Sequence, residues 1–426
     1  MSCNVETTTV AANKSGRGAC PRSSNSGGKP LFLTCSAPQV LPRMAYVGDV
    51  PVEASYHGSV LLYRLLSDYP ADKLTIIETA TESQAQRRLP NVNYVKHHIA
   101  NQRWLDTRFH PYVAAWFTRR APRLAPQISA SLNDFECEGV LTVAHGFGWL
   151  AAAKIAKRRN VPLHLMVHDD WPRVADVAPR FRNWLDQQFA QVYRQAQSRL
   201  CVSPAMSRSY EERYGEPASV IYPSRAANCP DYDEPPAHLA THDKPFTIAF
   251  AGTINSDGYI DALIAVQNAL KPINGRLLIF GPLTCEVAAQ LGLDDPNTEI
   301  CGLLTAADLL NRLRTETHAL FVPMSFADSD RANMEMAFPS KLADYTATGV
   351  SLLIYGPNYC SAVAWARENP GVAKVVEAER DLAAAIERLA TNPDHRIALG
   401  KRALDIGREY FSHARVQQRF HQSLSV

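Results

Sequence analysis

Short apolar runs bounded by turn residues recur along the whole chain. Most of them are apolar at nearly every position rather than at alternate positions, which is typical of strands covered on both faces. Helical patterns such as GWLAAAKIAKRRN and AADLLNRLRTETH lie between them. This alternation predicts parallel α/β sheets. The predicted strands begin at Leu31, Leu74, Val140, Leu163, Leu200 and Ser219 in the first half, and at Phe246, Arg276, Glu299, Ala319, Ser351 and Lys374 in the second.

A proline-rich, acidic segment divides the chain into two halves. Residues 225–243 hold three Pro and four acidic residues without an apolar period, which indicates a linker. We therefore predict two doubly wound α/β domains, residues 30–224 and 244–393, which face each other across a cleft and bind ligands at the carboxyl ends of their strands. The helix-rich residues 394–426 are expected to pack back toward the first domain, and the polar residues 1–29 to form a disordered leader.

Composition and charge exclude several classes of protein. Hydrophobic residues make up 46% and charged residues 20% of the 426 residues, as in a packed globular protein. The net charge of +2 gives no reason to expect nucleic-acid binding. No apolar stretch is long enough to span a bilayer, and the N-terminus lacks the apolar core of a signal peptide, so we expect a cytoplasmic protein. Nine cysteines without C-x-x-C spacing support neither a disulfide framework nor a zinc site.

One stretch departs from this charge balance. Between Ser83 and Arg123 the only acid is Asp106, while aromatic residues are interleaved with the cations. Two interpretations remain open: a solvated face whose aromatic rings point into the core, or a surface that meets anionic lipid headgroups or an anionic acceptor. The cations are Arg87, Arg88, Lys96, Arg103, Arg108, Arg119, Arg120 and Arg123, and the aromatic residues are Trp104, Phe109, Tyr112, Trp116 and Phe117.

The segment FPSKLADYTATG, residues 338–349, combines a helix start with cationic chemistry. It predicts a helix from about Ser340 to Gly349, followed by the strand SLLIYGP. Ser340 and Lys341 fall in the first turn, where free N–H groups and the helix dipole favour a phosphate. Asp344 follows one turn later and is suited to accept a hydrogen bond from a sugar hydroxyl. The alternative is a simple i,i+3 ion pair between Lys341 and Asp344.

Three further motifs have competing interpretations. In VHDDWP, at the carboxyl end of a strand, His168 suits a loop residue with satisfied hydrogen bonds, and Asp169 or Asp170 suits a helix N-cap. GFGWLA, residues 146–151, imitates a dinucleotide fingerprint but lies in the middle of its domain, which favours close helix packing instead. Asp328-Ser-Asp330 spells the D-x-D of metal-dependent sugar transferases. We attribute this short match to chance and expect no metal site.

FPSKLADYTATGVSLLIYGP resembles the donor-binding motif of family 4 retaining glycosyltransferases, which have the GT-B fold and commonly show K-L-x-E-Y-x-A-x-G-x-P-[LIV]. The segments that begin at Cys201, Val220 and Ala319 also resemble this family, and the match covers most of residues 140–420. The resemblance implies two Rossmann-like domains, the first for the acceptor and the second for a nucleotide-sugar donor. It also implies transfer of a sugar from a UDP- or GDP-type donor to an acceptor hydroxyl, with retention and without a metal or other cofactor.

The resemblance also implies a role for individual residues. His168 and Glu335 are expected to be the catalytic residues and to contact the transferred sugar. Asp344, where the family commonly has Glu, is expected to bind the ribose. His145 and Asp169 are candidates for acceptor or sugar contacts. Thr253 stands where Arg is common, so other cations are expected to hold the phosphates. The remaining donor-binding candidates are Gly58, Gly252, Thr253, Arg331, Ser340 and Lys341.

The resemblance implies a saccharide or lipid-linked acceptor, and with it a peripheral position at the inner face of the cell membrane. Two other classes stay open at this stage. A nucleotide-sugar epimerase shares the architecture, and a degenerate binding protein would lack activity altogether. A nicotinamide-dependent oxidoreductase is a more remote alternative.

Overall fold

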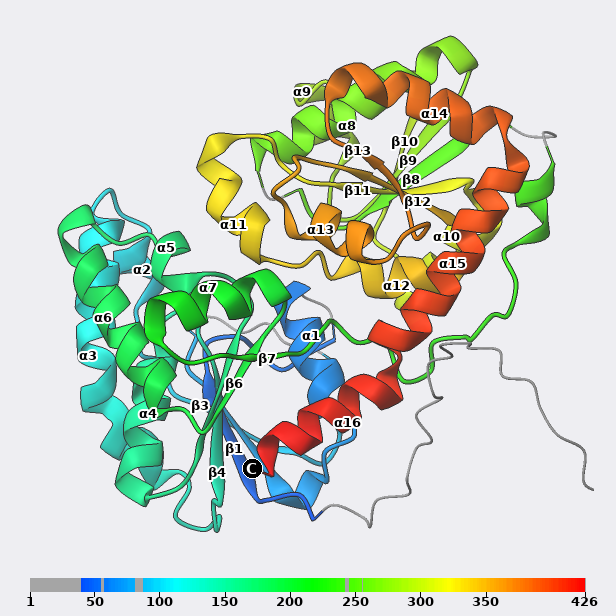
Figure 1. Ribbon diagram of the computed structural model, residues 1–426. Coiled ribbons are helices and arrows are strands. Elements are labelled where there is room, and N and C mark those ends of the chain that lie inside the picture. Colours follow the sequence, from blue (N-terminus) through cyan, green and yellow to red (C-terminus); the bar gives the residue numbers. More distant parts are fainter. Residues whose placement is uncertain (1–39, 55–56, 81–86, 242–244, 255, 426) are drawn as a thin grey trace, which may run out of the picture. The chain divides into compact units, whose positions relative to one another are not determined.

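The computed structural model describes residues 40–54, 57–80, 87–241, 245–254 and 256–425. Two parallel sheets organise this part of the chain (Figure 1). The first has the order β3-β2-β1-β4-β5-β6-β7 and the second the order β10-β9-β8-β11-β12-β13. In both sheets the order reverses beside the first strand of the domain, as in doubly wound folds. The predicted α/β class is therefore confirmed, whereas the predicted leader and the strand at Leu31 lie outside the described residues.

The first domain consists of the seven-stranded sheet and the helices on its two faces. Helix α4 packs on β1, β4 and β5, and against α3. The strands are β1 (Met44–Gly48), β2 (Leu74–Glu78), β3 (Asn93–Lys96), β4 (Gly139–Val143), β5 (Leu163–Val167), β6 (Ser198–Cys201) and β7 (Ser219–Val220). The helices are α1 (His57–Leu66), α2 (Gln102–Leu105), α3 (His110–Ala130), α4 (Gly148–Arg159), α5 (Trp171–Val174), α6 (Pro179–Gln195) and α7 (Pro204–Tyr214).

The second domain repeats this plan with six strands. Helix α8 packs on β9 and β11, and α14 packs against α8. The strands are β8 (Thr247–Ala251), β9 (Arg276–Phe280), β10 (Thr298–Gly302), β11 (Ala319–Pro323), β12 (Ser351–Tyr355) and β13 (Lys374–Val376). The helices are α8 (Asp257–Leu270), α9 (Cys285–Gln290), α10 (Ala306–Glu316), α11 (Arg331–Met336), α12 (Lys341–Thr348), α13 (Ser361–Glu368) and α14 (Leu382–Thr391).

The central strands are buried along their whole length, which explains their continuous apolar character. Every residue of β4, β5, β11 and β12 is buried. Strand β3, by contrast, lies at a sheet edge and is partly exposed, and its polar sequence NYVK gives no apolar run. Helix α12 ends where the sequence predicts, because Gly349 adopts a φ of +70° that favours glycine.

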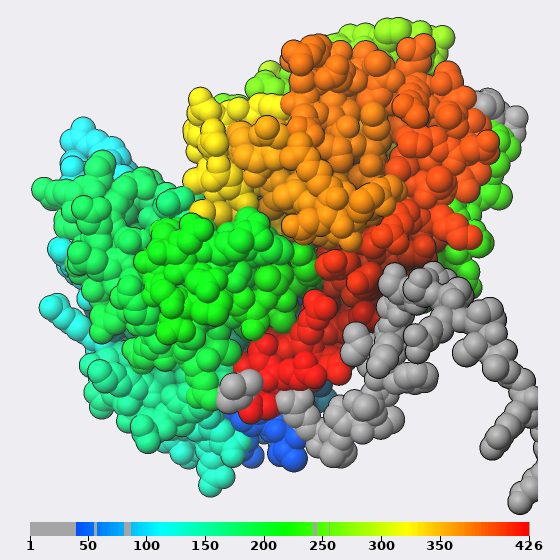
Figure 2. All heavy atoms as spheres, viewed as in Figure 1, coloured from blue at the N-terminus to red at the C-terminus, as the bar shows by residue number. Residues whose placement is uncertain are grey.

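The last two helices join the two domains. Helix α15 (Pro393–Phe411) packs on α12 and β12, and after Ser412 the helix α16 (His413–Leu424) contacts α1 and β6. Figure 2 shows α16 in red beside the green residues around β7. No helix of the described residues combines the length and the hydrophobicity that a membrane span needs. The cysteines that the structure describes are free thiols.

Candidate active site

The loop after β8 forms one wall of the candidate donor site. Gly252 follows this strand with a φ of +142°, and Gly281 follows β9 with a φ of +154°. A side chain at Gly281 would collide with the Gly252 carbonyl, so only glycine lets the two loops pack this closely. A Cβ atom at Gly252 would lie 3.5 Å from the Lys341 Nζ atom. The two predicted donor residues therefore lie side by side.

Lys341 brings a positive charge to this loop. Its Nζ atom lies 3.9 Å from the centroid of the Phe250 ring and 5.7 Å from that of Tyr259. Among the described residues no carboxylate pairs with it. Desolvation therefore lowers the pKa of Lys341 to about 7. The alternative ion pair with Asp344 does not form, and Ser340, which is exposed, begins the helix without a side-chain cap.

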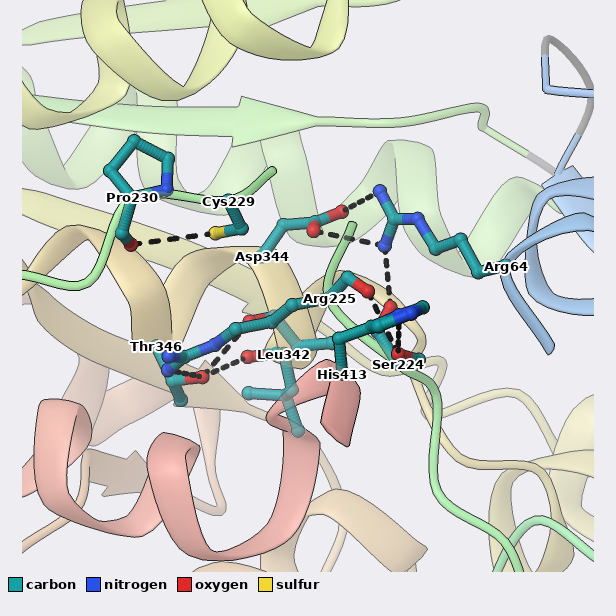
Figure 3. A network of polar contacts seen from close by, with 10 residues as sticks. Arg64, Ser224, Arg225, Cys229, Pro230, Leu342, Asp344, Thr346 and His413 are labelled. Carbon is teal, nitrogen blue, oxygen red and sulfur yellow. Dashed lines mark hydrogen bonds and ion pairs between the residues drawn. The ribbon is translucent and has the colours of Figure 1, made fainter. Parts of the chain in front are cut away.

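Asp344 pairs with the first domain instead. The Arg64 guanidinium of α1 donates to both carboxylate oxygens, with Nη1–Oδ1 and Nη2–Oδ2 distances of 3.0 and 3.2 Å (Figure 3). Arg225 supports the same helix, because its guanidinium donates to the Ala343 carbonyl and to the Thr346 hydroxyl. Sequence reasoning missed both arginines, which lie far from α12 in the chain and carry no local motif.

The loop after β5 carries the candidate residues of the first domain. The Nε2 atom of His168 is buried, and within the described chain it has no hydrogen-bond partner. Burial, with a smaller contribution from His145, lowers the pKa of His168 to about 4, so its imidazole is neutral at pH 7. Desolvation also raises the pKa of Asp169. The exposed His145 ring lies 4.5 Å from the ring of Trp171.

Asp170, the next residue, has a structural role that the sequence does not reveal. Its fully buried carboxylate accepts hydrogen bonds from Arg213 Nη1 at 3.0 and 2.9 Å and from the Tyr210 hydroxyl at 3.1 Å. The side chain makes no helix-cap bond, although Asp170 precedes α5. These bonds anchor the loop that carries His168 and Asp169 to helix α7.

Tyr259, at the start of α8, lies near residues of both domains. Burial chiefly raises its pKa to about 12, and charges at Cys360, Asp330 and Asp169 contribute to this shift. Asp169 of the first domain therefore lies within electrostatic range of Tyr259, whose ring is also close to Lys341. The structure brings together Gly252, Lys341 and Tyr259.

Arg331, a predicted donor-binding residue, pairs with Glu335, a predicted catalytic residue, and both lie on α11. Their Nε and Oε1 atoms are 2.9 Å apart, and the Arg331 guanidinium also covers the Tyr359 ring at 4.4 Å. Asp328 and Asp330 form a 3₁₀ turn directly before this helix. Within the described ranges no three metal-ligating side chains form a cluster.

The GFGWLA segment binds a carboxylate of the protein itself. Gly146 has a φ of +58°, and a side chain there would collide with Asp49. Asp49 accepts hydrogen bonds from the backbone N–H groups of Phe147 and Gly148, at the start of α4, where a dinucleotide would place its pyrophosphate. Because Asp49 occupies these N–H groups, they are not available for the pyrophosphate of a dinucleotide. Gly58, in α1, is exposed, and a Cβ atom there would have no neighbour within 4 Å.

Comparisons with known proteins agree with this architecture. Residues 90–224 match the family model Glycosyltransferase Family 4. HepE of Anabaena, crystallised with UDP and glucose, is 13% identical, with 90% of this chain and 99% of that chain covered and a TM-score of 0.63. Sucrose-phosphate synthase of Thermosynechococcus elongatus is 13% identical, with coverages of 89% and 97% and a TM-score of 0.64.

The lipopolysaccharide outer core galactosyltransferase WaaB is 14% identical, with coverages of 89% and 98% and a TM-score of 0.55. No curated protein matches the sequence. At these identities the solved structures show the fold, which is that of GT-B proteins. The fold is therefore that of GT-B proteins, and residues 90–224 are similar to Glycosyltransferase Family 4. The resemblance to family 4 is confirmed over residues 90–224, which include only the first part of the expected range 140–420.

Proposed function

We propose that the protein transfers a hexose from a UDP-sugar to an acceptor hydroxyl, with retention of configuration and without a metal ion. The observation that carries this proposal is Lys341, a partly buried cation that has no counter-ion among the described residues and lies beside Gly252 at the carboxyl end of β8. Such a site favours an anion, and Asp344 one turn further along α12 offers an acceptor for sugar hydroxyls. Crystals of HepE hold UDP or UDP-glucose, which supports a uridine nucleotide as the donor.

The catalytic contribution of these residues is electrostatic. Lys341, with Ser340 and the N–H groups at the start of α12, stabilises the negative charge that develops on the leaving diphosphate. The loop of Gly252 and Thr253 lets the diphosphate approach the backbone closely. On the side of the first domain, Gly58 allows the same close approach. Arg331 and Glu335 form an ion pair, which has to open when the donor binds. Arg331 then binds the phosphates and Glu335 the sugar.

The first domain supplies the other side of the reaction. His168 presents a neutral imidazole whose Nε2 atom is free to hydrogen-bond a sugar hydroxyl. Asp169 and His145 are placed to contact the sugar or the acceptor, which is a saccharide or a lipid-linked saccharide. The raised pKa of Asp169 makes its carboxylate a better hydrogen-bond acceptor for a hydroxyl than a fully solvated acid.

Incubation with UDP-hexoses and a panel of saccharide acceptors in excess EDTA tests this function. We expect acceptor-dependent release of UDP, and NMR of the product should show the anomeric configuration of the donor. An isomerised nucleotide sugar would identify an epimerase, and an unchanged donor a binding protein. Complete loss of activity in EDTA, restored by manganese, would contradict metal independence and assign a role to Asp328 and Asp330.

The proposal includes peripheral contact with an anionic membrane through α2 and α3. Four aromatic side chains of this region are exposed, and only Phe117 of those named in the sequence turns into the core. Arginines stack on the exposed rings: Arg108 on Phe109, Arg120 on Trp116 and Arg180 on Tyr112. Exposed aromatic rings among arginines suit the headgroup region of an anionic bilayer. The exposed residues are Trp104, Phe109, Tyr112 and Trp116.

Reversal of Arg108, Arg120 and Arg123 to Glu is expected to weaken binding to anionic vesicles by at least about 100-fold, since each lost cation contributes about 1 kcal/mol and the new carboxylates repel the surface. Cosedimentation with anionic and neutral vesicles at two salt concentrations measures this effect. The matched control reverses Arg380, Arg388 and Arg402 of the second domain and should change binding little. Equal partitioning of the unmodified chain to both kinds of vesicle, or to neither, would contradict membrane contact.

A further inference from the structure

Helix α12, which carries Lys341 and Asp344, is linked to the first domain through Arg64. The two guanidinium N–H groups of Arg64 meet the two oxygens of Asp344, and Nη1 also donates to the Ser224 carbonyl at 2.6 Å (Figure 3). Such fork-to-fork pairing fixes the plane of a carboxylate as well as its position. The orientation of Asp344 is therefore set from outside its own domain.

Arg64 is itself held firmly. Only 13% of its side chain is exposed, and its backbone carbonyl accepts a hydrogen bond of 2.6 Å from Gln417 of α16. One turn along, Asp68 pairs with His413 at 2.7 Å. These contacts hold the backbone of α1 at Arg64, and the bond to the Ser224 carbonyl orients the guanidinium independently of Asp344.

Arg64 does not saturate the carboxylate of Asp344. A carboxylate offers about four lone-pair positions, of which the arginine fork uses two. The Asp344 side chain remains 39% exposed, so further donors have access to it. Two vicinal hydroxyl groups match this remaining capacity, and Lys341 lies on the same face of α12, one turn away.

We propose that Arg64 is a positioning residue that holds Asp344 so that its remaining lone pairs accept the two ribose hydroxyls of the donor nucleotide. This inference rests on the proposed function and adds a specificity to it. The arginine–carboxylate pair selects ribonucleotides over nucleotides that lack the 2′- and 3′-hydroxyls. Lys341 contributes equally to both, because it interacts with the phosphates.

Calorimetry with UDP and 2′,3′-dideoxyuridine 5′-diphosphate tests the inference. The unmodified chain is expected to prefer UDP by at least about tenfold, the scale of hydrogen bonds to a charged group. Arg64→Met should reduce this preference to less than about threefold and leave the affinity for the dideoxy nucleotide nearly unchanged, which a general loss of structure would not do. Arg64→Lys, which keeps one charged donor and the fold, should give an intermediate preference.

Two controls separate positioning from general effects. Arg367→Met removes a second forked pair, with Glu377, and should leave the preference intact. In the double variant of Arg64→Met and Asp344→Asn, the loss of preference for UDP should equal that of Asp344→Asn alone. Arg64 acts only through Asp344, so once the carboxylate is gone the second change has no further effect.

Each remaining outcome decides against the inference. An unchanged preference in Arg64→Met, with UDP still bound, overturns the positioning role but not the proposed function. Tighter UDP binding in that variant shows that Arg64 competes with the nucleotide. If the unmodified chain binds neither UDP nor GDP, the proposed function fails, and this inference fails with it.

Discussion

Replacement of Lys341 by Met is expected to weaken UDP binding by about 10- to 150-fold, the range of a charge-assisted hydrogen bond, while it makes the free protein more stable. The desolvated ammonium group has no counter-ion in the described structure, so its removal relieves a cost of folding. A gain of about 1 kcal/mol corresponds to a rise in melting temperature of about 2–4 °C. Calorimetry and thermal unfolding measure the two effects.

The same lysine gives binding and stability opposite pH dependences. Its pKa is about 7 in the folded chain against an ordinary value of 10.5. The unfolded chain therefore binds more protons between these values, so the contribution of Lys341 to stability increases as pH rises through this window. UDP affinity should decrease over the same window, because the free enzyme loses its cation. Both slopes should disappear in Lys341→Met.

Lys401→Met is the matched control for this experiment. Lys401 of α15 is exposed and pairs with Glu234, so its replacement should alter neither property by more than a few tenths of a kcal/mol. Full UDP affinity in Lys341→Met would assign the phosphates to other residues. A marked loss of stability would mean that the lysine has a partner that compensates its burial.

Asp170→Asn is expected to lower the free energy of unfolding by about 3 kcal/mol, and with it the melting temperature by roughly 6–12 °C. The change removes a fully buried charge and leaves the Arg213 guanidinium, whose side chain is 20% exposed, without its buried partner. Chemical denaturation measures the loss.

Asp186→Asn provides the control, because Asp186 pairs with the same arginine at 3.0 Å but is 44% exposed. Its replacement should cost less than about 1 kcal/mol. Equal effects of the two substitutions would contradict the view that burial, rather than pairing itself, makes Asp170 important.

The central strands and the helix of Lys341 could be predicted because their signals are local. A strand buried on both faces must be apolar throughout. The helix after Ser340 has local signals at both ends, because Ser340 favours a helix start and Gly349 a helix end. Strand β3 gives no such signal, since it is an edge strand with polar positions. The first strand of the described chain, Met44–Gly48, was not predicted either, although its run MAYVG is buried throughout and as long as that of β2.

The partners within the candidate site could not be predicted, because they join distant parts of the chain. Arg64 and Asp344 are separated by 280 residues, and Asp49 reaches Gly148 across 99. Folding alone brings these side chains together. The pair of Arg331 and Glu335 is different, because its i,i+4 spacing on a helix was visible in the sequence and favours an ion pair.

The position of α16 has a consequence for synthesis on the ribosome. This helix buries Val416, Phe420 and Leu424 and contacts β6 and α1, elements of the first domain. It is translated about 190 residues after β7, which at about 5–20 residues per second means a delay of roughly 10–40 s. During that interval the nascent first domain presents an uncovered apolar surface. A chaperone that binds such surfaces would find its target only while the second domain is being made.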